Sequence, residues 1–407
     1  MSHGPESAYA WRRLVVALAL STIGGIGLWS TVVVLPAVQA DFGVDRGSAS
    51  LPYTLTMIGF AFGGIVMGRF ADRRGVAFPV MIGAAALSVG YIVAANTANL
   101  WQFALAQGLI IGFLGSSSTF GPLVADTSHW FTRNRGIAVA ICASGNYLSG
   151  TIWPPILEHF VAAYGWRATH IGIGIFCAAT MLPLSLLLRR PTPVGVMTAE
   201  PHPALSTRDD LNGAQPVSPN VLQGLLVVAG LSCCVAMSMP QVHIVAYCTD
   251  LGYGVARGAE MLSLMLGMGV VSRLASGWVS DHIGGVRTLL VGSALQCLTL
   301  IFYIPFNGLV SLYVVSALFG LAQGGIVPSY AMIVREYFSP REAGARLGLV
   351  LMATIIGMAL GGWMSGVIFD WTGSYRAAFV NGILWNLLNV SIAFWLLRQP
   401  RGRAAHA

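Results

Sequence analysis

Long apolar stretches, separated by short polar segments, run along almost the whole of this 407-residue chain. Each stretch holds about 20 mainly apolar residues, the length that an α-helix needs to cross the hydrocarbon core of a bilayer. Such stretches must be helices, because lipid offers no partner for an unpaired backbone amide. The pattern predicts twelve transmembrane helices, at residues 14–38, 51–71, 78–96, 101–125, 137–160, 169–188, 221–249, 259–280, 287–306, 309–334, 345–369 and 375–397.

The composition excludes a soluble globular protein. Hydrophobic residues make up 56% of the chain and charged residues only 9%, whereas a soluble domain has about 25% charged residues. The sequence therefore predicts an all-α integral membrane protein. Enzyme chemistry is not expected, because no phosphate-binding loop, zinc-ligand spacing or Ser/His/Asp arrangement occurs, and we expect no cofactor and no metal.

The positive charges predict the orientation of the chain. All 22 of them are arginines, because the sequence contains no lysine. If the N-terminus lies in the cytoplasm, seventeen arginines fall in cytoplasmic segments and only four fall on the opposite side, namely Arg46, Arg167, Arg257 and Arg376. This bias predicts a multi-pass protein of the plasma (inner) membrane with both termini in the cytoplasm. The same topology, together with anionic lipid, accounts for the net charge of +7, so we expect no nucleic-acid partner.

The sequence divides into two similar halves. A polar, proline-rich stretch at 189–220 separates an N-terminal six-helix bundle at 1–188 from a C-terminal six-helix bundle at 221–407, and we interpret it as a cytoplasmic linker. "GRFADRRG" at 68–75 returns as "GWVSDHIG" at 277–284, an offset of 209 residues. Such a duplication, with a binding site between the repeats, is typical of secondary transporters.

The two copies of this motif resemble the signature loop of the major facilitator superfamily. In that superfamily the loop fastens the two halves together and is released when the carrier opens inward. The resemblance implies a gating role for Gly68, Asp72, Arg73 and Gly75, and for Gly277, Asp281 and Gly284 in the second copy. We expect the second copy to fasten less firmly, because His282 stands where a basic pair would be.

A narrower resemblance concerns "GPLVADTSHWFTRNRGIAVAICASG" at 121–145 and "SRLASGW" at 272–278. Both are similar to segments of the monocarboxylate transporters and the bacterial lactate and oxalate/formate carriers. The resemblance implies that Arg273 holds the carboxylate of the substrate and that His243 matches a histidine of some relatives. This chain departs from the group at Gly269, where several carriers have an aspartate, and it lacks their membrane lysine.

Arg273 is also unusual on physical grounds. An arginine near the centre of a transmembrane helix costs about 2.5–3.5 kcal/mol to insert, so it is expected to bind a ligand or a partner. A static salt bridge is the alternative, but acidic residues are nearly absent from the predicted membrane interior. A guanidinium grips a carboxylate through two hydrogen bonds, and one buried cation neutralises one carboxylate. This arithmetic favours a monocarboxylate, unless a protonated His243 balances a second charge.

Other polar and aromatic residues within the spans are candidates for lining a substrate cavity. His243 is the candidate for carrying a coupled proton, or else a neutral histidine bonded to a carbonyl group. The remaining candidates either line the cavity or form interhelical contacts, and they are Asn146, Tyr147, Ser117, Gln323 and Trp29.

The sequence thus predicts a monomeric secondary active transporter of a small organic anion. The charge arithmetic favours a monocarboxylate, either a lactate- or pyruvate-like acid or a larger aromatic or branched acid. We expect alternating access and coupling to a proton, with the organic acid, the proton or a counter-anion, and the lipid bilayer as its partners. Two alternatives stay open. One is an organic-anion exchanger of the oxalate/formate type, and the other is an efflux carrier for drugs or metabolites.

Overall fold

The computed structural model describes residues 6–190, 218–338 and 340–398, and all regular structure in these residues is helical. Eleven segments in this part of the chain are long and apolar enough to cross a bilayer. The helices, in chain order, are α1 (Ala8–Gly24), α2 (Ile26–Phe42), α3 (Arg46–Arg74), α4 (Ala77–Ala95), α5 (Leu100–Leu105), η1 (Ala106–Gly115), η2 (Ser116–Thr119), α6 (Gly121–Trp130), α7 (Arg135–Ala143), α8 (Gly145–Leu186), α9 (Pro219–Asp250), α10 (Val255–Ile283), α11 (Gly285–Phe302), α12 (Leu309–Gln323), α13 (Ile326–Tyr337), α14 (Pro340–Thr372) and α15 (Tyr375–Arg398).

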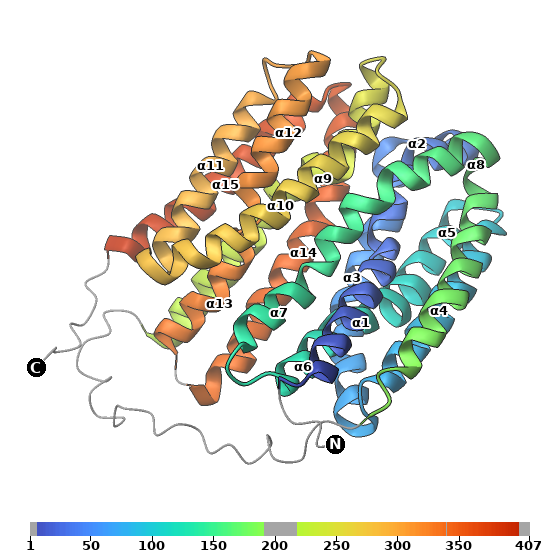
Figure 1. Cartoon of the computed structure of the whole chain (residues 1–407). Coiled ribbons are helices and arrows are strands. Elements are labelled where there is room, and N and C mark those ends of the chain that lie inside the picture. The colour runs from blue at the N-terminus through green and yellow to red at the C-terminus, as the bar shows by residue number, and fades with distance from the viewer. Residues whose placement is uncertain (1–5, 191–217, 339, 399–407) are drawn as a thin grey trace, which may run out of the picture.

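A turn inside α8 accounts for the difference between eleven segments and twelve predicted spans. Residues Arg135–Leu186 count as one apolar segment. Within this segment, however, Gly165 has a φ of 78°, which lies outside the range of a right-handed α-helix. Glycine adopts this conformation without a steric penalty because it has no Cβ. The chain turns there at the top of Figure 1, so the two parts of α8 are the helices predicted at 137–160 and 169–188. The all-α, twelve-helix prediction is confirmed.

Short polar side chains begin several of the helices. Asp45 precedes α3 and accepts a hydrogen bond of 2.6 Å from the backbone N–H of Ser48. Ser7, Asn99 and Ser218 cap α1, α5 and α9 in the same way. Such caps satisfy N–H groups that have no partner within the helix. The hydrogen bonds donated by Ser48 also hold the pKa of the Asp45 carboxyl below its ordinary value.

Several spans are interrupted near their centres. The first span breaks at Gly25, between α1 and α2, and the fourth span changes from α-helix to π-helix and then to a 3-10 turn. Ser116, in that turn, donates a hydrogen bond of 2.9 Å to the carbonyl oxygen of Gly24. Broken helices are tolerated at membrane depth where the protein itself satisfies the freed backbone groups.

The helices form two groups with their own cores. In Figure 1, α1 to α8 (blue to green) lie on one side and α9 to α15 (yellow to red) on the other. We call these groups the N-bundle and the C-bundle. The two groups meet where α3 packs against α14, where α8 packs against α10, and where α2 packs against α9. The division of the chain at 189–220 stays a prediction, because residues 191–217 lie outside the described residues.

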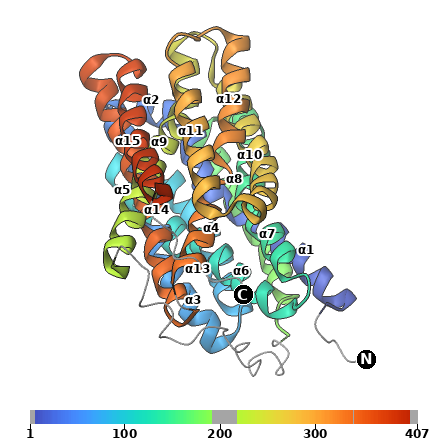
Figure 2. The same cartoon turned by 90° about the vertical axis from the view of Figure 1, so that its left-hand side faces the viewer.

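The long helices run between two ends of the molecule. In Figure 2, α2 and α12 lie toward the upper end, and α6 and α13 lie toward the lower end. We call the end that holds residues 43–46 and 250–254 the latch end, and the end that holds 68–75 and 277–284 the motif end.

The surroundings of the glycines differ between these two ends. A Cβ added at Gly366 of α14 would lie 2.9 Å from the carbonyl oxygen of Arg46, and one at Gly362 would lie 3.1 Å from the ring of Tyr53. At the motif end, a Cβ added at Gly68 or Gly277 would meet no described atom within 4 Å. The two bundles are therefore in close contact at the latch end, whereas these two motif glycines face no described neighbour.

Candidate functional site

Arg273 lies on α10 and reaches across to the N-bundle. Its Nη1 donates a hydrogen bond of 3.2 Å to the carbonyl oxygen of Ala143, at the end of α7. The guanidinium carbon lies 4.3 Å from the ring centroid of Tyr147 on α8, a cation–π contact. Its Nε is buried and has no hydrogen-bond partner. None of the ion pairs found in the described part of the chain includes Arg273.

Tyr147 fits against Gly269, which lies one helical turn before Arg273. A Cβ added at Gly269 would lie 2.5 Å from Cε1 of Tyr147 and 2.7 Å from its Cδ1. These distances are too short for any side chain other than that of glycine while the ring keeps its place. Gly269 is therefore the residue that lets the Tyr147 ring lie between α8 and α10.

Two more of the predicted residues belong to the same cluster. Trp29 of α2 is only 4% exposed, and its Nε1 donates a hydrogen bond of 3.2 Å to the backbone carbonyl oxygen of Asn146. The side-chain Oδ1 of Asn146 is buried without a partner. The structure thus brings Trp29, Asn146, Tyr147 and Arg273 together where the two bundles meet. We call these four residues the arginine cluster.

Gln323 and Ser117 make their contacts elsewhere. Gln323 is fully buried in the C-bundle, where its Oε1 accepts a hydrogen bond of 2.7 Å from Gln241 of α9. Ser117 donates a hydrogen bond of 2.6 Å to the carbonyl oxygen of Phe113, within its own span. Neither side chain is hydrogen-bonded to the guanidinium of Arg273 among the described residues. Their role in lining a cavity stays a prediction.

His243 is fully buried between α9, α14 and α15, and both of its ring nitrogens have partners. Nε2 lies 2.7 Å from the carbonyl oxygen of Gly362, and Nδ1 lies 3.1 Å from the hydroxyl oxygen of Tyr375. A carbonyl group only accepts, so Nε2 carries the proton in this arrangement. Arg46 only donates, and its Nη1 donates to the Tyr375 hydroxyl at 2.8 Å. The Tyr375 hydrogen is therefore free to be donated to Nδ1 of a neutral His243.

Arg46 is the centre of a polar network that joins the two bundles at the latch end. It begins α3 in the N-bundle and is 7% exposed. Its Nη2 lies 3.1 Å from Oδ1 of Asp250 on α9. The carboxylate of Asp370 on α14 accepts hydrogen bonds from the backbone N–H groups of Arg46 and Gly47, at 2.9 and 2.6 Å. We call Arg46, Asp250, Asp370 and Tyr375 the latch network.

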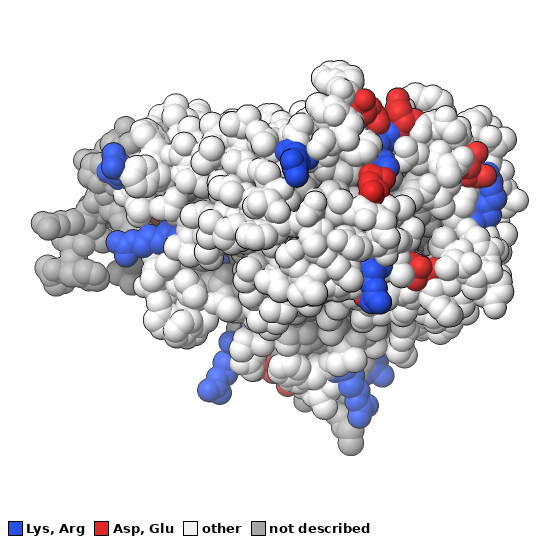
Figure 3. All heavy atoms as spheres, turned by 90° about the horizontal axis from the view of Figure 1, so that it is seen from above, with Lys and Arg blue, Asp and Glu red and all other residues white. Residues whose placement is uncertain are grey.

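Figure 3 looks onto the latch end and shows acidic side chains beside arginines on a largely uncharged surface. The chain pairs these charges in two different ways. Asp41 pairs with Arg167 at 2.9 Å, and both residues belong to the N-bundle. Asp250 occupies the matching place in the sequence repeat but pairs with Arg46 of the other bundle. The repeat alone predicts equivalent pairs, so sequence reasoning missed this contact between the bundles.

A family model described as the Major Facilitator Superfamily matches residues 17–313 and 271–407 of the chain. This protein belongs to the Major Facilitator Superfamily. Its curated relatives include monocarboxylate transporter 13 of Rattus norvegicus, 27% identical over 384 residues that cover 92% of this chain and 86% of the relative. They also include monocarboxylate transporter 11 of Homo sapiens, which is 27% identical in an alignment that covers 98% of this chain and 84% of the relative.

Solved structures show the same fold at lower identity. A bacterial homolog to the human lysosomal transporter Spinster, in an inward-facing and occupied conformation, has a TM-score of 0.75 and is 15% identical. The alignment covers 98% of this chain and 100% of the solved chain. The relatives of this chain and its structural neighbours are transporters rather than enzymes. The chain itself is a multi-pass membrane protein.

The superfamily motif lies at the motif end in both halves. Gly75 and Gly284 have φ values of 79° and 83°, and these left-handed conformations let α3 and α10 end in tight turns. Asp72 and Asp281 are exposed, and neither is in an ion pair with another described residue. The gating role of Gly68, Asp72, Arg73 and Gly75, and of Gly277, Asp281 and Gly284, stays a prediction.

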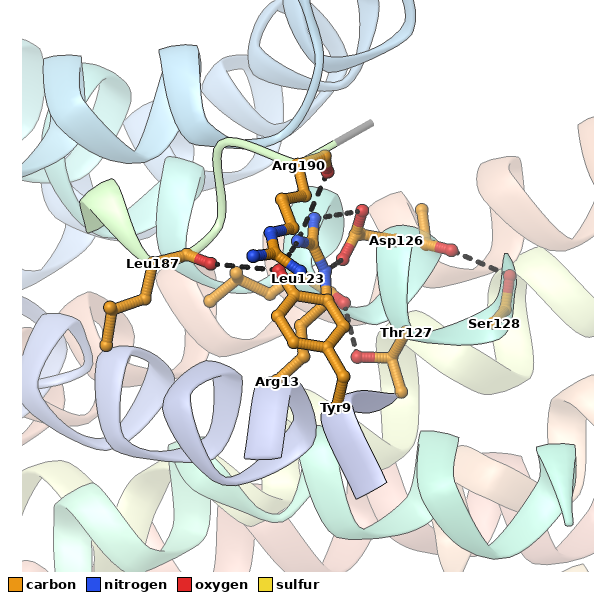
Figure 4. A network of polar contacts seen from close by, with 9 residues as sticks. Tyr9, Arg13, Leu123, Asp126, Thr127, Ser128, Leu187 and Arg190 are labelled. Carbon is orange, nitrogen blue, oxygen red and sulfur yellow. Dashed lines mark hydrogen bonds and ion pairs between the residues drawn. The ribbon is translucent and has the colours of Figure 1, made fainter. Parts of the chain in front are cut away.

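Sequence reasoning also missed a buried ion pair within the N-bundle (Figure 4). Nε and Nη2 of Arg13 donate to the two carboxylate oxygens of Asp126 at 2.8 and 2.9 Å. Nη1 of Arg13 lies within hydrogen-bond distance of the Tyr9 hydroxyl and the backbone carbonyl of Arg190. The pair joins α1, α6 and the end of the sixth span. Arg13 and Asp126 are 113 residues apart in the chain, so no local sequence pattern predicts their contact.

Removing one partner of this pair is expected to destabilise the protein strongly. Arg13→Gln leaves the Asp126 carboxylate buried and unpaired, which costs about 3–5 kcal/mol. Replacing both residues, as in Arg13→Met with Asp126→Leu, removes the charges together and is expected to restore most of that loss. Thermal unfolding of the purified variants in detergent measures both effects. Equal stability of the wild type and Arg13→Gln would contradict this assignment.

Proposed function

We propose that this protein carries a small monocarboxylate, such as a lactate- or pyruvate-like acid, across the plasma membrane by alternating access. The observation that carries the proposal is the Arg273 guanidinium, which lies between the bundles without a carboxylate partner among the described residues. A buried cation of this kind is costly unless it is paired. An ionised acid that enters between the bundles would supply the missing partner.

The chemistry of the arginine cluster supports one carboxylate and a small organic body. One guanidinium neutralises one negative charge, and its Nε is buried without a partner. The Asn146 Oδ1, also buried without a partner, can accept a hydrogen bond from a hydroxyl group next to the carboxylate. Tyr147 and Trp29 add apolar ring surface. Two relatives of this chain are named monocarboxylate transporters.

The distribution of interhelical contacts supports an orientation for this state. The latch network joins the bundles at one end, while the glycines of the two motif copies have open surroundings at the other. With the motif end and both chain termini in the cytoplasm, as the arginine distribution predicts, this is an inward-open state of a monomeric carrier. The motif loops would then fasten the halves only in the outward-open state.

We infer that His243 couples a proton to transport through the latch network. A proton added at Nδ1 turns this nitrogen from an acceptor into a donor and places a second cation at the Tyr375 hydroxyl, opposite Arg46. The ionisable groups that face this region include Asp250 and Tyr247 of α9, Asp370 of α14 and Tyr375 of α15. Protonation would weaken the contact of Arg46 with the C-bundle, so a proton entering from the latch side would favour opening there.

Transport by purified protein in liposomes tests this function. We expect an inward pH gradient to drive uphill uptake of lactate or pyruvate into vesicles that contain no counter-substrate. Uptake that requires an internal acid, and ignores the gradient, would instead favour the organic-anion exchanger. Efflux of neutral hydrophobic compounds with no binding of acids would overturn the proposal.

Replacing His243 is expected to separate exchange from proton-driven uptake. His243→Gln keeps a neutral hydrogen-bonding side chain but cannot take up a proton. We expect it to retain exchange of labelled for unlabelled acid and to lose uphill uptake driven by the pH gradient. His170→Gln is the matched control, because His170 is equally buried but belongs to the N-bundle. Undiminished gradient-driven uptake by His243→Gln would exclude His243 as the coupling residue.

A further inference from the structure

The contact between Tyr147 and Arg273 has a consequence for substrate selection, which rests on the proposed role of Arg273 as the acid-binding group. We propose that Tyr147 is a positioning residue that takes the place of an internal counter-carboxylate. Its ring orients the guanidinium of Arg273 without neutralising it. Gly269 provides the space for this ring.

The first effect of the Tyr147 ring is steric. The Tyr147 ring passes so close to α10 that a Cβ at Gly269 would lie 2.5 Å from Cε1. Residues four apart on a helix lie on the same face, so a side chain at 269 would point toward the guanidinium of Arg273. The ring therefore occupies the space from which a neighbouring carboxylate on α10 would reach Arg273.

The second effect of the Tyr147 ring is electrostatic. A ring face attracts a cation through its quadrupole but leaves the positive charge in place. A carboxylate in the same position would neutralise the charge and use the hydrogen-bonding edge of the guanidinium. In this structure, the guanidinium carbon of Arg273 lies over the Tyr147 ring, 4.3 Å from the ring centroid. One edge nitrogen bonds the Ala143 carbonyl, while Nε has no partner.

This arrangement selects for ionised acids. In this structure the charge of Arg273 is not neutralised, because none of the ion pairs found among the described residues includes it. An anionic carboxylate is attracted by the charge of the guanidinium and accepts hydrogen bonds from its unpaired edge. The neutral amide of the same acid would form only weak hydrogen bonds there. The ring also keeps the long side chain in one orientation, so less conformational entropy is lost when the acid binds.

The first test compares two substitutions of Tyr147. Tyr147→Phe keeps the ring, and Tyr147→Leu keeps apolar volume without the ring. We expect the Leu variant to bind acid about three- to thirtyfold more weakly than the Phe variant, the range of a cation–π contact. The effect should appear in KM more than in kcat, and the difference between acid and amide should shrink in the Leu variant. The probes are lactate, pyruvate, phenylpyruvate and 2-oxoisovalerate, with the amide of whichever acid gives the largest thermal shift.

The second test places a carboxylate where the ring now lies. Tyr147→Ala makes room for a side chain at 269, and Gly269→Asp is then compared with Gly269→Asn in that background. The two side chains have nearly the same volume but only one carries a charge. We expect the Asp variant to bind the acid about tenfold or more weakly than the Asn variant, because its own carboxylate pairs with Arg273.

The outcomes separate this inference from the proposed function. If Arg273→Gln binds every acid of the panel as well as the wild type, the proposed acid site is wrong. If Arg273→Gln loses binding but the Leu and Phe variants of Tyr147 bind alike, the acid site stands and the positioning role of Tyr147 is wrong. Equal binding by the Asp and Asn variants at 269 would also overturn the positioning role.

Discussion

Arg273→Gln is expected to abolish the thermal stabilisation that organic acids give to the wild-type protein. Glutamine keeps a polar, hydrogen-bonding side chain, which is shorter than that of arginine, and removes the charge and the paired donors of the guanidinium. Hydrogen bonds to charged groups contribute about 1.5–3 kcal/mol each, so the loss of one weakens binding about ten- to a hundredfold. Ligand-dependent shifts in the midpoint of thermal unfolding measure this directly. Uptake in liposomes should fall in proportion.

A matched control for this experiment lies on the same helix. Arg257→Gln also removes one arginine from α10, but Arg257 is exposed and pairs with Glu260 one turn away. We expect this variant to bind and transport the acid as the wild type does. Acid binding that survives Arg273→Gln would show that the guanidinium has only a structural role.

The second large effect is expected at the latch network. Arg46→Gln removes the contact of Nη2 with Asp250 and weakens the hydrogen bond to Tyr375, while Asp370 keeps its backbone donors. Removing one member of a largely buried ion pair costs about 3–5 kcal/mol in general. Because Asp250 is partly exposed, we expect a smaller shift of about 1–2 kcal/mol, or roughly five- to thirtyfold, toward the state that is open at the latch end.

Spin labels across the latch end measure this shift. Ala40 lies in α2 of the N-bundle and Arg257 lies in α10 of the C-bundle, and both are exposed sites for engineered cysteines. The distance distribution between the labels should move to longer values in Arg46→Gln. Asp41→Asn is the control, because it breaks the Asp41–Arg167 pair inside one bundle. Identical distributions in the wild type and Arg46→Gln would show that the network does not hold this end closed.

The sequence predicted some features of the site well and others poorly. Arg273 stands out in the sequence because a charge is costly in a long apolar run, and the structure places its guanidinium over the ring of Tyr147. The roles of Asn146 and Trp29 in a substrate site stay predictions. The surroundings of His243 could not be predicted, because its partners, Gly362 and Tyr375, are more than 100 residues away in the chain. Arg46 was assigned to an external loop, since its burial depends on the approach of α9, α14 and α15.

The helical fold can be predicted without tertiary information, because the length of the apolar segments and the need to satisfy backbone amides in lipid leave few alternatives. The internal repeat and the arginine deep in the eighth span are also evident from the sequence. The pairing of side chains across the bundles, such as Arg46 with Asp250 and Tyr147 with Arg273, is seen only in the three-dimensional structure. These contacts depend on how whole helices pack in three dimensions, and no local spacing along the chain records that packing.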